Sequence, residues 1–589
     1  MSETTSLFAE SAIDAPRPIK VVVIGAGFSG IIAGIRFLQR VPNVQLVIYE
    51  ALAGVGGTWF ANKYPGLACD IPAHCYQLTF HEKTDWSSFY ARGSEIRAYL
   101  ESVVDKYNLW PFIQLEHRLS GAIYSEATGK WNLTIQRPNK DSESKFEEFQ
   151  DSADVLFTGM GSLSRWKWPD IKGLHSFGGK VMHSAQWETG EGDLSGPWED
   201  TVKSWKDKKV GIIGVGSSAI QLVPALQPKV KELCQYVRGK TWISSLFLGD
   251  EAEKLGMGKM ESNCNEMAFP GNQRTKRSTD EFTDKDKALF KDPAYYKEFR
   301  RDLESTLNSI HVVTMKGHPV QEGSRAMFKA DMLQRLRTRP EIAEHLIPDF
   351  PVGCRRLTPG PGYLESLCQD NVKFITTEIK QILPNGIETL DGKVEELDVI
   401  VCATGYDTSY QLPFPIIGRG GVQLSDKYTP HARTYLSIAV DGFPNWFQSM
   451  GSGSLLILIE RSVEYAVQAT LKLQREHLKS MEVKPEAVDD WDEFIEHYFK
   501  KTVFSETCRS WYKAGKSEGR VVALWPGSCL HAVRALEHPR WEDYTYEPLD
   551  GHKNRFFWAG NGTTVAEETP GADRAWYLSE VDFPPVPLH

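Results

Sequence analysis

Two parts of the chain share one pattern, in which short apolar runs alternate with segments of helical apolar spacing. Ile19–Ile24 and Val44–Tyr49 are largely apolar, β-branched runs of the length of buried strands. The same sequence of patterns recurs with apolar runs at Val210–Ile213 and Leu233–Val237. Strands that alternate with helices are typical of parallel sheets. The pattern therefore predicts an α/β fold built from two Rossmann-like units.

A glycine-rich loop joins the first strand to the first helix. It reads Gly25-Ala-Gly-Phe-Ser-Gly30, and the next strand ends at Glu50. In this motif the glycines permit a tight turn, close approach of the backbone to a pyrophosphate and close packing of helix on strand, while the acid accepts from ribose hydroxyls. Taken alone the motif could be only a tight turn, but the flanking strands and helix favour a dinucleotide site. The predicted binding residues here are Gly25, Gly27, Phe28, Ser29, Gly30 and Glu50.

The second unit carries the loop Gly214-Val-Gly-Ser-Ser-Ala219, and here the second strand leads to Arg238 instead of an acid. An acid repels a ribose 2′-phosphate, whereas an arginine pairs with it. The first site therefore suits FAD or NAD and the second suits NADPH. A plain surface charge is the alternative for Arg238. The predicted NADPH-binding residues are Gly214, Gly216, Ser217, Ser218, Gln221, Arg238 and Lys240.

The segment from Gly56 to Asp70 is punctuated by glycine and proline and carries several aromatic residues. Such a composition is typical of a loop that wraps a flat ligand, and a plain surface loop is the alternative. The residues predicted to face the first nucleotide from this part of the chain are Gly57, Thr58, Trp59, Asp70 and Tyr76.

The patterns divide the chain into segments with different expected roles. A strand at 397–402 is expected to return the chain to the first sheet, and a β-meander is expected at 111–157. The predicted segments are a disordered lead (1–18), a discontinuous FAD-binding domain (19–165 and 398–589), a linker (166–208), an NADPH-binding domain (209–249 and 349–397) and a helical insertion that acts as a substrate lid (250–348).

Composition narrows the class of protein. The net charge of −10 argues against a nucleic-acid binder. The nine cysteines form no C-x-x-C pair, which predicts reduced thiols and neither a disulfide framework nor a metal site. The start of the chain does not read as a signal peptide, and the longest aliphatic run, 455–459, is far too short to span a membrane. We therefore expect a cytoplasmic protein with no membrane or nucleic-acid partner.

Two longer motifs lie between and beside the glycine loops. The first, F-x-G-x-x-x-H-x-x-x-W, consists of Phe177, Gly179, His183 and Trp187, and the second runs G-G-x-W-x-x-x-x-Y-P-G-x-x-x-D from Gly56 to Asp70. With both glycine loops, they make residues from about 19 to 455 resemble class B flavoprotein monooxygenases of the Baeyer–Villiger type, in particular fungal members from secondary metabolism. The sequence departs from the family at Glu188 and at Gly451-Ser-Gly453, which affects only detail on the substrate side.

The resemblance implies a chemistry and roles for particular residues. NADPH reduces FAD, O2 reacts with the reduced flavin, and one oxygen atom is inserted beside a ketone carbonyl to give an ester or lactone. The family's active-site arginine matches Arg356, and Asp70 matches the carboxylate that orients it. A surface arginine pair and a turn-capping aspartate are the alternatives. His183 is expected to orient the linker by hydrogen bonds and not to act as a base, so that residues 177–187 couple movement of the NADPH domain to the flavin.

Three other functions stay open. The same cofactors can oxygenate nitrogen or sulfur or hydroxylate, with the activated oxygen as an electrophile; a fixed cation at Arg356 favours the nucleophilic reaction instead. A flavoprotein disulfide reductase would need a closely spaced cysteine pair, which the sequence lacks. A nucleotide-binding protein without catalysis is the third alternative.

Overall fold

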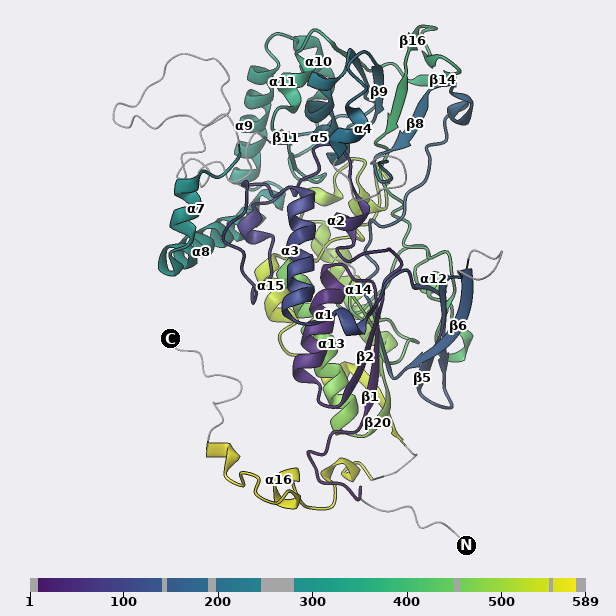
Figure 1. Cartoon of the computed structure of the whole chain (residues 1–589), viewed down its shortest axis with the longest axis vertical. Coiled ribbons are helices and arrows are strands. Elements are labelled where there is room, and N and C mark those ends of the chain that lie inside the picture. The colour runs from purple at the N-terminus through teal and green to yellow at the C-terminus, as the bar shows by residue number, and fades with distance from the viewer. Residues whose placement is uncertain are drawn as a thin grey trace.

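The computed structural model describes residues 9–139, 146–188, 198–244, 280–449, 456–549 and 554–578. Figure 1 shows two lobes along the long axis, each built on a five-stranded sheet whose paired strands all run parallel. The first sheet has the order β19 (Trp446–Gln448), β7 (Val155–Thr158), β1 (Ile19–Ile24), β2 (Val44–Tyr49) and β3 (Ile113–Gln114). The second has the order β13 (Val372–Ile375), β10 (Glu232–Tyr236), β9 (Lys209–Ile213), β17 (Val399–Cys402) and β8 (Lys180–His183). The predicted α/β fold with two Rossmann-type units is confirmed.

The central strand of the first lobe is buried on both faces. Val21 and Val23 lie in a core with helices α1 (Phe28–Arg40) and α13 (Leu456–Arg475). Val22 and Ile24 lie in a second core with the antiparallel meander β4 (Arg118–Ser125), β5 (Lys130–Pro138) and β6 (Phe146–Ala153). Because successive strand residues point to opposite faces, a strand covered on both faces must be apolar throughout. Burial on both faces explains why β1 is a nearly continuous apolar run in the sequence.

The second lobe repeats the arrangement. Val210 and Ile212 pack with α5 (Ser217–Leu226) and α11 (Tyr363–Leu367). Ile213 faces the other way, into a core with Phe177 and the small antiparallel sheet β14 (Ile379–Leu383), β15 (Gly386–Thr389) and β16 (Val394–Glu396). A Cβ atom on Gly179 would lie 2.3 Å from the carbonyl oxygen of Asp398 and 2.6 Å from the Phe177 ring. Part of the first motif thus serves close packing of this lobe.

Two expected domain assignments are wrong at the level of strand pairing. The strand expected to return to the first sheet, β17, pairs with β9 and β8 in the second sheet. β8 itself, expected as part of a linker, is the edge strand of that same sheet. An apolar run shows that a strand is buried but not which sheet buries it, because pairing partners lie far apart in sequence. The chain re-enters the first sheet only at β19.

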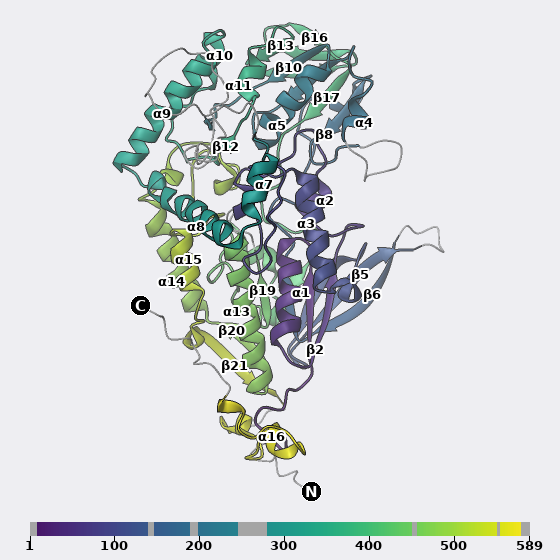
Figure 2. The ribbon, with the colours of Figure 1, turned by 60° about the vertical axis from the view of Figure 1, so that its left-hand side comes forward.

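The insertion bridges the lobes. Its described part is helical, as expected, and consists of α7 (Asp284–Phe290), α8 (Pro293–Ser309), α9 (Pro319–Arg335) and α10 (Pro340–Leu346). Phe290 and Leu303 belong to the core of the first lobe, whereas Met332 and Ile342 belong to that of the second. Figure 2 shows α8 beside the lower lobe and α9 and α10 on the upper one. Residues 250–279 of the expected lid lie outside the described residues.

The prediction that the N-terminal lead is disordered is wrong for residues 9–18, which are ordered. The amide of Ala9 donates to Phe557, and that of Ile13 donates to Thr563, at 3.0 Å in the second case. Ala9 and Ala12 are buried. The lead is ordered because the last described segment of the chain, 554–578, lies against it at the lower end of the molecule in Figure 1. Residues 1–8 lie outside the described part.

The expectation that every cysteine is a reduced thiol is wrong for one pair. Cys354 and Cys508 form a disulfide across 154 residues of sequence, with their Cα atoms 6.4 Å apart. Neither spacing nor count could reveal it, because the two residues meet only when the C-terminal region folds back onto the second lobe. The free thiols among the described residues are Cys69, Cys75, Cys234, Cys368, Cys402 and Cys529.

The C-terminal region after α13 forms β20 (Leu478–Val483), which pairs with β21 (Tyr544–Pro548), and α14 (Pro485–Phe499).

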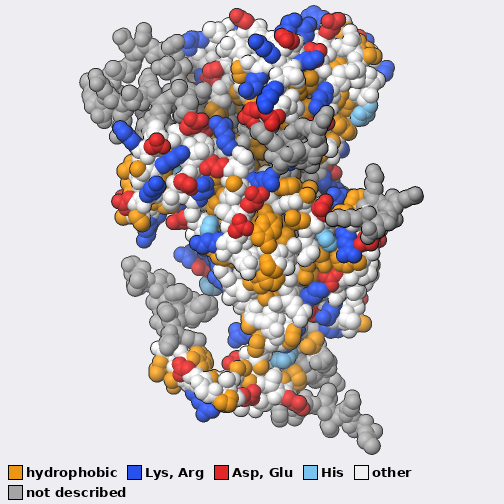
Figure 3. All heavy atoms as spheres, in the orientation of Figure 1, with side chains coloured by type: hydrophobic (Ala, Val, Ile, Leu, Met, Phe, Trp, Pro, Cys, Tyr) orange, Lys and Arg blue, Asp and Glu red, His pale blue; other side chains and the backbone are white. Residues whose placement is uncertain are grey.

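Over the described ranges, no helix is both long and apolar enough to cross a membrane. On the face in Figure 3, Lys and Arg side chains are interspersed with Asp and Glu. The further α-helices of the described residues are α2 (Thr58–Ala61), α3 (Gly93–Lys106), α4 (Trp198–Val202), α12 (Leu424–Lys427), α15 (Cys529–Ala535) and α16 (Val565–Glu568).

Gly30 offers a test of the packing beneath the first loop. A Cβ atom there would lie 1.7 Å from the carbonyl oxygen of Gly25, so Gly30→Ala should lower the free energy of unfolding by about 1–3 kcal/mol. The matched control is Gly323→Ala in α9, where a Cβ atom meets nothing within 4 Å. Thermal unfolding of both variants measures the effect; a Gly30→Ala variant as stable as the wild type would contradict the packing argument.

Candidate active site between the two lobes

Both sheets reverse their strand order beside the central strand. In the first, β2 and β3 follow on one side of β1 and β7 lies on the other; in the second, β10 and β17 flank β9 in the same way. Ligands of open α/β sheets bind at such a switch point, outside the carboxyl ends of the strands. The chain leaves each central strand there through a glycine with positive φ, Gly25 (φ 100°) and Gly214 (φ 127°).

The first loop leaves the shape that a pyrophosphate needs. Gly27 is the N-cap of α1, and a Cβ atom on Gly57 would lie 3.0 Å from the Cα atom of Gly27. Two glycines thus face each other at the positive end of a helix, where a side chain would fill the cradle. The Glu50 carboxylate is buried and accepts from the amides of Ala26 (2.6 Å) and Leu52 (2.8 Å). Burial raises the pKa of Glu50, although those amides oppose the rise.

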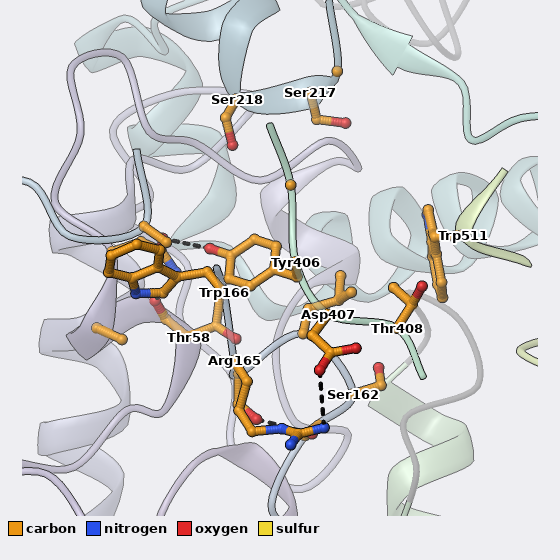
Figure 4. A pocket seen from close by; sticks show the side chains of 18 of the residues that line it. Thr58, Ser162, Arg165, Trp166, Ser217, Ser218, Tyr406, Asp407, Thr408 and Trp511 are labelled. Atoms are coloured by element: carbon orange, nitrogen blue, oxygen red, sulfur yellow. Dashed lines mark hydrogen bonds and ion pairs between the residues drawn. The ribbon is translucent and has the colours of Figure 1, made fainter. Parts of the chain in front are cut away.

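One cavity of about 1910 Å³ connects the two loops. Sites for one small ligand are typically about 300–1,000 Å³, so this space is large enough for two dinucleotides. Figure 4 shows Ser217 and Ser218 of the second loop facing Tyr406 and Trp166 across it. The predicted residues that line the cavity are Gly25, Gly27, Phe28, Ser29, Glu50, Gly57, Thr58, Trp59, Asp70, Tyr76, Trp187, Gly214, Gly216, Ser217, Ser218, Gln221, Arg238 and Arg356.

Five predicted residues do not line the cavity. Gly30 lies beneath the first loop, and Lys240 forms an ion pair with Asp349 at 2.9 Å. The other three are the motif residues Phe177, Gly179 and His183. The sequence predicts that both Arg238 and Lys240 bind NADPH. The exposed Arg238 lines the cavity, whereas Lys240 pairs with a carboxylate outside it.

Arg356 and Asp70 meet in the cavity from opposite lobes. The guanidinium donates from Nε to Oδ2 (2.5 Å) and from Nη2 to Oδ1 (2.6 Å), a bidentate pair. Their side chains are 25% and 18% exposed. Burial by itself lowers the pKa of Arg356, but the charge and hydrogen bonds of Asp70 outweigh it and raise that pKa. The arrangement is a permanently charged cation with a fixed plane.

The second motif docks the first lobe onto the second. The Tyr64 hydroxyl donates to Oε1 of Gln221 in α5 (2.8 Å), and Nε2 of Gln221 donates to the carbonyl of Ala68 (2.9 Å). Gly66 has φ 77°, and a Cβ atom there would lie 2.5 Å from the Gln221 carbonyl oxygen. The loop can approach α5 this closely only with glycine. The same docking brings Asp70 up to Arg356.

His183 lies behind the cavity wall. Its ring stacks on Trp166 with centroids 4.4 Å apart, Nε2 is 3.2 Å from the Thr404 hydroxyl, and Nδ1 accepts from the Ala185 amide. Burial lowers the pKa of His183 to about 4. A neutral imidazole held between two connecting segments fits the expected role in orientation, which stays a prediction.

Sequence reasoning missed several wall residues. Tyr406, whose hydroxyl donates to Asn62 Oδ1 (2.7 Å), and Asp407, whose carboxylate is 3.6 Å from Arg165, follow β17. The A-T-G-Y-D segment at 403–407 could have indicated them. The others, Arg509, Ser510, Trp511 and Gly515, come from the C-terminal region, for which the sequence carries no comparable signal.

Fold and cavity together define a two-dinucleotide α/β protein, and comparison with known proteins narrows the class. A family model described as an NAD(P)-binding Rossmann-like domain matches residues 23–92. The FAD-binding monooxygenase tazF of Aspergillus terreus is 36% identical over 96% of this chain and 95% of its own length. A Baeyer–Villiger monooxygenase of Pseudomonas aeruginosa is 31% identical over 87% of this chain and 88% of its own length.

Solved structures agree with this. A steroid monooxygenase bound to NADP has a TM-score of 0.70 at 26% identity and covers 90% of this chain and 100% of its own. A closed cyclohexanone monooxygenase, with a TM-score of 0.73 at 23% identity, covers 91% of this chain and 100% of its own and shows the shared fold. The chain belongs to the family of FAD-binding monooxygenases that includes the Baeyer–Villiger enzymes. The resemblance seen in the sequence is confirmed, and FAD and NADPH are the cofactors of this family, as predicted.

The lowered pKa of His183 predicts a pH dependence of stability. Below an unfolded pKa of 6.5 the unfolded state takes up a proton that folded His183 refuses until about pH 4, so stability falls as the pH drops through this window. In His183→Gln the loss between pH 7 and pH 5 should be smaller by about 2 kcal/mol, measured by denaturant unfolding. His538→Gln, at an exposed position, should keep the wild-type loss. A wild-type loss in His183→Gln would refute the burial argument.

Proposed function

We propose that this protein is an FAD- and NADPH-dependent Baeyer–Villiger monooxygenase. It inserts one atom of O2 beside the carbonyl of a small-molecule ketone and gives an ester or lactone, as a step in secondary-metabolite biosynthesis. The observation that carries the proposal is the Arg356–Asp70 pair in the wall of the cavity between the two glycine loops.

The residues of the two loops fit the two cofactors. When bound, FAD supplies the redox chemistry and the reaction with O2. The first loop and Glu50 would hold its phosphates and ribose, and Phe28, Trp59 and Tyr76, which line the same cavity, form an aromatic group in which Tyr76 lies 5.3 Å from Phe28 and 5.5 Å from Trp59 between ring centroids. The second loop would hold NADPH, and Arg238 would pair with its 2′-phosphate.

Arg356 supplies positive charge where a ketone would react. Oxygen insertion by nucleophilic attack on a carbonyl develops negative charge on oxygen, and a fixed, desolvated cation stabilises that charge more than it stabilises the neutral ketone. An arginine suits this task because it keeps its proton in a partly buried site. Asp70 fixes the guanidinium plane, so that little reorganisation is needed during the reaction.

The relatives support the class and leave the ketone to experiment. The Pseudomonas protein is named a Baeyer–Villiger monooxygenase. The tazF protein, which matches nearly the whole of this chain, comes from a fungus. Secondary metabolism is inferred from the resemblance to fungal members of the family.

Arg356→Ala should abolish ester formation while NADPH still reduces the flavin, because the cation is needed only after reduction. Purified enzyme with NADPH and O2 is offered a panel of cyclic and polyketide-like ketones, and mass spectrometry detects the gain of one oxygen. The control Arg339→Ala removes a surface arginine paired with Glu341 and should form ester normally. Ester formation by Arg356→Ala would contradict the assignment. Wild-type product oxygenated on nitrogen or sulfur would favour the electrophilic alternative.

Arg238→Gln should raise the KM for NADPH at least about tenfold and leave the KM for NADH within about twofold, because a charged hydrogen bond to the 2′-phosphate is lost. Flavin reduction under anaerobic conditions measures both. Lys240→Gln is the comparison: its ammonium pairs with Asp349, so its effect on NADPH should be small. An unchanged preference for NADPH in Arg238→Gln would make Arg238 a plain surface charge.

A further inference from the structure

A loop from the C-terminal region forms part of the cavity wall beside Arg356. We call residues 506–517 the C-terminal loop. Ser510, Trp511 and Gly515 of this loop line the cavity, and Figure 4 shows Trp511 across it from Trp166. This part of the chain lies after both nucleotide-binding units and outside both glycine motifs. The contacts of the C-terminal loop hold it in one shape and tie it to the segment that carries Arg356.

The C-terminal loop is closed on itself. The Cys508 amide donates to Ser517 (3.0 Å), and the Gly515 amide donates to Ser510 (3.0 Å). The buried ammonium of Lys513 donates to the carbonyls of Glu506 (2.5 Å) and Ser517 (2.8 Å), which lie at its two ends. A buried cation surrounded by the carbonyls of one loop holds that loop in one shape.

The C-terminal loop is also tied to the segment that carries Arg356. The disulfide joins Cys508 to Cys354, two residues before the active-site arginine, and both cysteines are buried. Such a bond limits how far the loop and this segment can separate. Four residues after Cys508 the chain reaches Tyr512.

Tyr512 lies beside the Arg356–Asp70 pair. Its ring is 7% exposed and packs edge-on against Phe504 with centroids 5.5 Å apart. The charges of the Arg356 guanidinium and of the Asp70 carboxylate both act on its hydroxyl, and Tyr512 acts in turn on Arg356. Burial raises the pKa of Tyr512, so the hydroxyl stays neutral and does not compensate the cation.

We propose that Tyr512 is a positioning residue that holds the Arg356 guanidinium toward the reacting ketone, with the disulfide keeping the C-terminal loop in place. Asp70 fixes one edge of the guanidinium from the first lobe. A second, neutral partner from a different part of the chain stops rotation about that edge without removing positive charge from the site. This inference rests on the proposed function, because only oxygen insertion requires the cation to be aimed.

The test separates flavin reduction from oxygen insertion. Tyr512→Phe keeps the ring and removes the hydroxyl. The rate of flavin reduction by NADPH should stay within about twofold of wild type, whereas the ester formed per NADPH consumed should fall about tenfold, with hydrogen peroxide making up the difference. Cys508→Ser, which releases the loop but keeps Tyr512, should shift the yield in the same direction.

The matched control is Tyr498→Phe, which removes a half-buried hydroxyl bonded to His311 Nε2 (3.0 Å) away from the cavity. It should keep the wild-type yield. Wild-type yield in Tyr512→Phe would overturn the inference; if that variant fails to retain flavin, wild-type yield in Cys508→Ser would overturn it instead. Wild-type enzyme that forms no ester from any ketone would refute the proposed function, a result distinct from either.

Discussion

The ion pair between Arg356 and Asp70 is the contact on which the rest of the site depends. Its two charges come from different lobes and are largely removed from water, so each would be strongly unfavourable without the other. The bidentate geometry therefore fixes the distance between the lobes as well as the plane of the guanidinium. The docking of Tyr64 and Gly66 onto α5 serves the same alignment, because it places the loop that ends at Asp70.

The two lobes form their ligand crevices in the same way. Each sheet reverses its strand order beside a central strand, and each central strand ends in a glycine whose Cβ atom would strike a backbone carbonyl of the neighbouring strand's extension, Gly159 in one case and Ala403 in the other. The reversal of strand order leaves a crevice at the carboxyl ends of both sheets. Because the crevices face each other, they join into one cavity, where a hydride donor and a flavin can meet.

The segments between and after the lobes shape that cavity. Residues 159–166 and 403–408 carry the chain from one lobe to the other, and the amide of Asp407 donates to the carbonyl of Arg165 where they run side by side. His183 and Trp166 stack behind this crossing. The C-terminal loop closes the side near Arg356. A site assembled from so many separate segments can be aimed accurately only if each is held by its own contacts.

The sequence by itself determined the local features: two strand–glycine loop–helix units, the acid and arginine that distinguish their second strands, the helical insertion and the family motifs that identified Arg356 and Asp70. These are recognisable because glycine conformation, strand burial and helix start depend on neighbouring residues. The tertiary structure alone decided that β8 and β17 belong to the second sheet, that Cys354 meets Cys508, that residues 9–18 are ordered, and that Tyr512 lies beside Arg356. Each of these depends on partners far away in the chain, and no local pattern encodes which distant segment a buried residue will meet.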